Sequence, residues 1–85
     1  MATKFTWDRS PESDVAYYRV FMSGVFQAKV PQTAVGVKPE WPLPATGSGN
    51  LTVSAVDNSG NESDMSVSVP FDKIPPAAPA NPMLL

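Results

Sequence analysis

The stretch that decides the fold is Leu51-Thr-Val-Ser-Ala-Val-Asp-Asn-Ser-Gly-Asn-Glu-Ser63. Its first five residues, 51–55, alternate apolar and polar side chains. A period of two is typical of a β-strand with one buried face and one face in water. The small polar residues and the glycine of 57–61 then favour a tight turn. A second alternation at 65–69 completes the pattern of a β-hairpin.

Other segments also show strand patterns. Residues 5–7 place a polar residue between two aromatic ones, and residues 15–22 alternate over a longer run. A turn at 23–24 leads into a returning strand at 25–30, which ends before a proline because proline cannot donate to a ladder. We expect a further short strand at 33–37. No helical period is present, so the sequence predicts an all-β fold of antiparallel strands.

Residues 38–50 break this pattern. Pro39, Pro42 and Pro44 place three prolines within six residues, which excludes a helix and a central strand. We expect a stiff loop that carries Trp41. Two interpretations of this residue stay open: it covers the end of the core, or it is an exposed contact residue, since aromatic residues are enriched at interfaces.

Residues 53–63 also resemble the F–G hairpin of a fibronectin type III domain, in the form common in bacterial and phage proteins. The resemblance covers about residues 5–70. It implies a fibronectin type III or immunoglobulin-like antiparallel β-sandwich, in which Trp7 belongs to strand B. Two features depart from the family: strand A is missing at the N-terminus, and Leu51 stands where strand F usually has a tyrosine. The expected core consists of Trp7, Tyr18, Val20, Leu51, Val53 and Ala55.

The chain divides into a sandwich domain, residues 1–71, and a proline-rich C-terminal arm, residues 72–85. We expect the arm to be extended in the polyproline II manner. Residues 75–79, Pro-Pro-Ala-Ala-Pro, resemble the linker that leads into strand A of the next domain in tandem arrays of the family. We therefore expect the arm to act in trans. Either it pairs with the open edge of strand B, the strand around residues 5–7, in a stacked like subunit, or it docks on an unlike protein. The candidate interaction residues are Ile74, Pro75, Pro76, Pro79, Met83, Leu84 and Leu85, together with Trp41.

The composition narrows the classes of function. The 85 residues include no histidine and no cysteine, which removes the usual transition-metal ligands, most nucleophile–base pairs and any disulfide. The carboxylates and amides of 57–64 contain ligands that calcium prefers, but a turn explains the same residues. We expect no catalytic residue, no cofactor and no metal. A net charge of −2 with scattered cations predicts no nucleic-acid partner, and no apolar run is long enough for a membrane span.

The expected function is structural and non-enzymatic. A free fibronectin-like domain without a signal peptide resembles small accessory proteins of phage virions, which decorate capsids or sit on tails and collars. The resemblance implies a virion protein, made in the host cytoplasm, whose partners are copies of itself, the major capsid protein or tail proteins. The alternative is a carbohydrate- or surface-binding accessory module of an extracellular protein. That alternative needs an exposed, coplanar aromatic platform, which only Trp41, Tyr17 and Phe21 could build.

Overall fold

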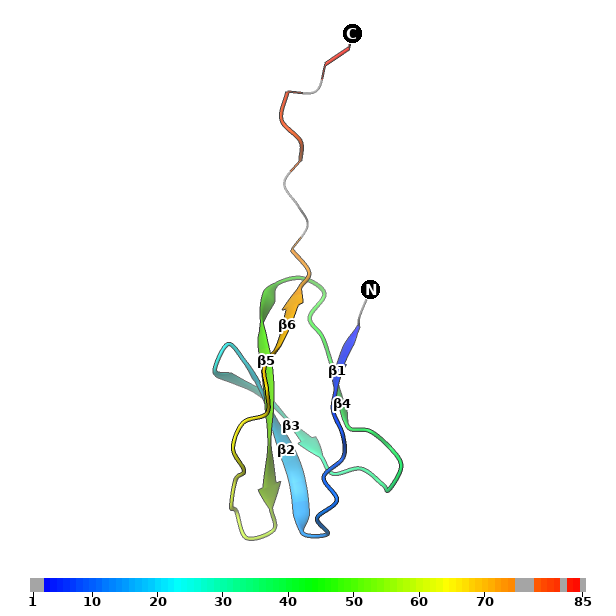
Figure 1. The fold of residues 1–85 in the computed structure, drawn as a ribbon, viewed down its shortest axis with the longest axis vertical. Helices are drawn as coiled ribbons and strands as arrows, with labels where there is room; N and C mark the ends of the chain where they lie inside the picture. Colours follow the sequence, from blue (N-terminus) through cyan, green and yellow to red (C-terminus); the bar gives the residue numbers. More distant parts are fainter. Residues whose placement is uncertain (1–2, 75–77, 82, 85) are drawn as a thin grey trace.

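The computed structural model describes residues 3–74, 78–81 and 83–84 of the chain. These residues form strands and loops without a helix (Figure 1), so the all-β prediction is confirmed. The strands are β1 (Lys4–Thr6), β2 (Val15–Met22), β3 (Val25–Pro31), β4 (Glu40–Pro42), β5 (Ser48–Asp57) and β6 (Val69–Asp72).

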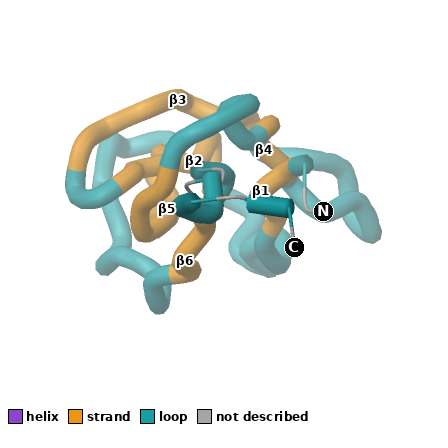
Figure 2. The backbone as a smooth tube through the Cα atoms, turned by 90° about the horizontal axis from the view of Figure 1, so that it is seen from above, coloured by secondary structure: helices purple, strands orange, loops and turns teal. Residues whose placement is uncertain are grey.

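The strands form two antiparallel sheets. One contains β1 and β4, and the other has the strand order β3-β2-β5-β6. Figure 2, seen from above, shows the four-stranded sheet on one side of the molecule and the β1–β4 pair on the other. The fold is therefore a two-layer arrangement with apolar side chains between the layers. The buried side chains of this core are Phe5, Val15, Tyr18, Val20, Leu51 and Val53.

The expected core is largely present. Tyr18, Val20, Leu51 and Val53 are buried, and Ala55 is half-buried against the same cluster. The predicted residues share one buried face because Val20 of β2 lies opposite Val53 of β5. This register puts alternate residues of both strands on the same side of the sheet.

Trp7 lies at the edge of this core rather than at its centre. It follows β1, is half-buried, and has its ring centroid 5.2 Å from that of Phe5 and 5.4 Å from that of Tyr18.

The turn between β2 and β3 has the predicted form. Ser23 and Gly24 have φ values of 50° and 80°. Positive φ at both central residues defines a type I′ turn, whose twist matches that of the flanking strands. Only glycine adopts this backbone without a steric cost, which is why Gly24 fits here.

The strand expected at 33–37 is absent, and this prediction was wrong. The Val37 N–H donates to the Ala34 carbonyl over 3.0 Å, and Gly36 has a φ of 83°. These two features describe a turn. Val35 and Val37 project into solvent, so their apolar character reflects no buried face.

The strand that does pair with β1 comes from the proline-rich segment that was expected to be a loop. β4 runs from Glu40 to Pro42 and places Trp41 opposite Phe5. Pro42 lies at a position whose backbone N faces away from β1, and so it costs no hydrogen bond of the ladder. Pro39 is fully buried and anchors the start of the strand.

The second strand of the expected hairpin is shorter than the alternation at 65–69 predicted. Ser63 and Ser66 donate their N–H groups to the carbonyls of Ala55 and Val53, and their hydroxyls accept the N–H groups of the same two residues. From Ser63 to Ser66 the chain advances by three residues, while the partner strand advances by only two, from Ala55 to Val53. The side chains of this segment therefore do not alternate between the two faces of the sheet. The apolar side chains of 65–69 consequently stay exposed, and regular pairing begins only at Val69.

The arm leaves the sheet slightly later than the predicted boundary. β6 ends at Asp72, but the Lys73 N–H still donates to the Gly47 carbonyl over 2.7 Å. Thr46 also donates its hydroxyl to the Lys73 carbonyl. Backbone contact with the sandwich therefore continues through Lys73.

Candidate functional site

The edges of the two sheets are the first candidate for a binding surface. In an antiparallel ladder, successive residues turn their N–H and C=O groups alternately toward the partner strand and away from it. One backbone hydrogen bond beside each of β3, β4 and β6 shows which of its residues face the partner strand. These hydrogen bonds run from Gln32 N–H to Ala16 O, from Leu43 N–H to Thr3 O, and from Lys73 N–H to Gly47 O. Together with the strand registers, this alternation places Pro31, Pro42 and Pro70 at positions that face outward.

A proline whose nitrogen faces outward hinders the addition of another strand to the sheet edge, and it removes no hydrogen bond from the existing sheet. Pro31, Pro42 and Pro70 each lack the N–H that an added strand needs, and none of them lies where the existing ladder needs one. Three of the four sheet edges in the described residues thus carry the same protection against strand addition.

The outer edge of β1 has no such proline. The Leu43 N–H bond to Thr3 makes Phe5 and Trp41 face each other, so Lys4 and Thr6 direct their N–H and C=O groups away from β4. The Lys4 ammonium lies 2.9 Å from the Glu40 carboxylate, on the neighbouring strand. Its charge is therefore held over β4 and does not shield the outer edge.

An open pocket lies next to Trp7, the residue that follows β1. Its polar lining residues are Asp8, Ser10, Ser54, Ser63, Asp64 and Ser66. It has a volume of about 250 Å³, and its apolar lining comes from Trp7, Tyr18, Val53 and Ala55. The indole Nε1 of Trp7 is buried and has no hydrogen-bond partner among the described residues. Buried donors are normally satisfied, so the end of β1 lacks a polar contact as well as apolar cover.

The arm carries the apolar residues predicted to make contacts. Ile74, Met83 and Leu84 are 58%, 72% and 100% exposed, and Figure 1 shows the arm projecting away from the sheets. Pro79 is also exposed. Among the other candidate residues, Pro75, Pro76 and Leu85 lie outside the described residues. The arm positions stay predictions, because no partner chain is present to test them.

Trp41 is not brought together with the arm residues. It lies on β4, is half-buried, and packs against the core cluster, which matches the first of its two interpretations. Its remaining exposed surface leaves the contact role as a prediction.

The aromatic platform required by the carbohydrate-binding alternative is not formed. Phe21 is buried, Trp41 faces the core, and the Lys29 ammonium lies 4.2 Å from the ring centroid of Tyr17. Phe21 meets Phe26 at an interplanar angle of 71°. Stacking on a sugar needs flat, accessible rings, and these rings are covered or tilted.

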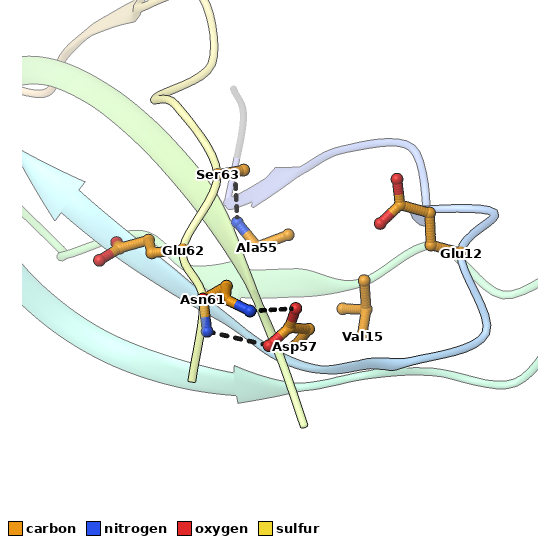
Figure 3. A pocket seen from close by; sticks show the side chains of 7 residues that line it. All are labelled: Glu12, Val15, Ala55, Asp57, Asn61, Glu62 and Ser63. Atoms are coloured by element: carbon orange, nitrogen blue, oxygen red, sulfur yellow. Dashed lines mark hydrogen bonds between the residues drawn. The ribbon is translucent and has the colours of Figure 1, made fainter. Parts of the chain in front are cut away.

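In the turn at 57–61, the carboxylate oxygens of Asp57 accept hydrogen bonds from other residues of the same turn. The carboxylate of Asp57 accepts the backbone N–H groups of Ser59 and Asn61, each over 2.9 Å, and the side-chain amide of Asn61. Figure 3 shows the side chains of Asp57 and Asn61 pointing toward each other in a second pocket, which Glu12, Val15 and Glu62 also line and which is separate from the one beside Trp7. Hydrogen bonds from Asn61 lower the pKa of Asp57. In the part of the chain that the structure describes, no cluster of carboxylates could hold a metal ion.

A second carboxylate is fixed on the outer face of the four-stranded sheet. The hydroxyl of Ser54, which is buried, donates to Glu62, and Arg19 lies 2.7 Å from the other oxygen of the same carboxylate. The Ser54 hydrogen bond, followed by Arg19, lowers the pKa of Glu62 below its ordinary value of 4.5. Ionised Glu62 therefore stabilises the fold above that value, and the contribution is lost as the pH falls through the lowered pKa.

Comparisons with protein-family models, with curated proteins and with solved structures found no match. Within residues 3–74, 78–81 and 83–84, no helix is long and apolar enough to cross a membrane.

The edge of strand B was expected to receive the arm of a stacked subunit, but no residue of β1 was singled out as an interaction residue. Its signal was available in the strand patterns combined with the positions of Pro31, Pro42 and Pro70. Using that signal required the register of each ladder, because only the register tells an outward proline from an inward one.

Proposed function

We propose that this chain is a non-enzymatic structural module of the fibronectin type III kind, which assembles through its C-terminal arm. The observation that carries the proposal is the combination of an unprotected β1 edge with an exposed, apolar arm tip at Met83 and Leu84. Extended segments commonly bind proteins by adding to an open sheet edge.

The strand order supports the fibronectin-like part of the proposal. A β1–β4 pair opposite a sheet ordered β3-β2-β5-β6 matches strands B and E opposite strands C′, C, F and G. In this correspondence the open edge of β1 is the position that strand A occupies in the family. The resemblance of residues 53–63 adds the more specific proposal, a phage virion accessory protein on a capsid, tail or collar.

The partners proposed on this basis are other copies of the chain, or capsid and tail proteins. The test is to purify particles from the source that encodes the chain and to detect the protein by mass spectrometry and electron microscopy. We expect a fixed number of copies per particle. Absence from purified particles contradicts the virion role, and binding in a glycan screen of the monomer would support the carbohydrate-binding alternative.

A further inference from the structure

We infer that the open edge of β1 binds the arm tip of a second copy of this chain, an inference that rests on the proposed assembly function. The tip, Met83–Leu84, adds antiparallel to Lys4–Thr6 as a short strand. An apolar side chain of the tip fills the pocket beside Trp7. Each copy thus receives an added strand at β1 from its neighbour.

The backbone selects this edge. Lys4 and Thr6 offer two N–H and two C=O groups to an added strand. The edges of β3, β4 and β6 each interrupt that series with an outward proline. A strand that adds to the described sheets therefore finds its continuous set of partners only at β1.

The pocket and the tip match in chemistry. The pocket is open to solvent and measures about 250 Å³, and most of its exposed lining surface is apolar. Leu84 is 100% exposed and contacts no part of its own sandwich.

The direction of the arm favours binding to the β1 edge of a second copy over binding to the β1 edge of its own copy. In Figure 1 the arm leaves from the end of the sandwich at which β1 begins. An arm that continues onward meets a copy stacked on that end and runs antiparallel to its β1. To reach its own β1, the arm would have to reverse and lie parallel to that strand.

The arm is also long enough. The 12 residues that follow Asp72 up to Leu84 span about 37 Å at about 3.1 Å per residue. The longest strand, β5, has 10 residues and a length of about 33 Å. The tip can therefore reach any point along the β1 of a stacked neighbour. Because this contact joins two different surfaces, it builds open chains unless its rotation closes a ring.

The test uses three variants of the full chain. Lys4→Pro removes the outward N–H and so copies the protection of the other edges, without removing a bond to β4. Lys4→Ala is the matched control, because it removes the same ion pair with Glu40 but keeps the N–H. Leu84→Asp charges the tip at a side chain that is fully exposed. Circular dichroism checks that each variant is folded.

Sedimentation velocity over a concentration series measures assembly. We expect concentration-dependent oligomers for the parent and for Lys4→Ala, and monomers for Lys4→Pro and for Leu84→Asp. A mixture of these two monomers should form one-to-one dimers, because each supplies what the other lacks. A labelled peptide of residues 78–85 should bind Leu84→Asp and should not bind Lys4→Pro, a result that loss of assembly alone would not give.

Two results overturn the inference. If Lys4→Pro and Leu84→Asp assemble as the parent does, assembly uses another surface, and the proposed function stands without this site. If the parent is monomeric at the highest concentration reached and the peptide binds no variant, the edge does not receive the arm. Detection on purified particles still decides the proposed function separately.

Discussion

The hydroxyl of Tyr18 offers a sharp test of how the loops at one end of the sandwich are held. It accepts the Ser10 N–H over 2.8 Å and donates to the side-chain carbonyl of Gln32 over 2.7 Å. Tyr18 is 3% exposed. One hydroxyl therefore joins the loop that follows β1 to the segment that follows β3.

Tyr18→Phe removes these two hydrogen bonds and leaves the ring in place. A typical hydrogen bond contributes about 0.5–1.5 kcal/mol, and a buried donor left without a partner costs about 1–3 kcal/mol. We expect a loss of about 2 kcal/mol in the free energy of unfolding. For a domain of this size, about 1 kcal/mol lowers the melting temperature by about 4–8 °C, so the expected decrease is about 8–16 °C.

Tyr17→Phe is the matched control. It removes the same hydroxyl from the next residue of β2, where that hydroxyl forms no hydrogen bond to any described residue and the ring packs under Lys29. Thermal denaturation followed by circular dichroism, with urea denaturation at pH 7, measures both variants. Equal melting temperatures for the two variants would refute the assignment of Tyr18 as the connecting residue.

Three further predictions concern the core, the irregular edge and acid stability. Leu51→Ala deletes a side chain that is 1% exposed and should cost about 2–5 kcal/mol in urea denaturation, whereas Val67→Ala, on an exposed side chain, should change stability by less than about 0.5 kcal/mol. Ser66→Ala removes the hydroxyl acceptor of a β5 N–H and should cost about 1–3 kcal/mol; an equal cost for the exposed Ser68→Ala would contradict this role. Glu62→Gln should destabilise the protein at pH 7, and the difference from the parent should shrink as the pH falls below 4.5; a difference independent of pH would show that the charge of Glu62 does not act.

The sequence by itself determined the class of the fold and its central strands. The period of two at 51–55 and 15–22 fixes which side chains share a face, because successive residues of a strand point to opposite sides. The turn at 23–24 and the turn at 57–61 were readable for the same local reason, since glycine and small polar residues meet backbone requirements within a few residues.

Only the tertiary structure decided the outer strands and the candidate site. The apolar residues at 33–37 and 65–69 looked like strands, but pairing depends on partners far away in the sequence. Thus Glu40–Pro42 pairs with β1 despite Pro42, whose N atom faces away from the ladder. Likewise, Ser63 and Ser66 replace backbone acceptors with their hydroxyls and shift the register. The open edge of β1 follows from this register and not from local preference, because a proline protects an edge only when its nitrogen points outward.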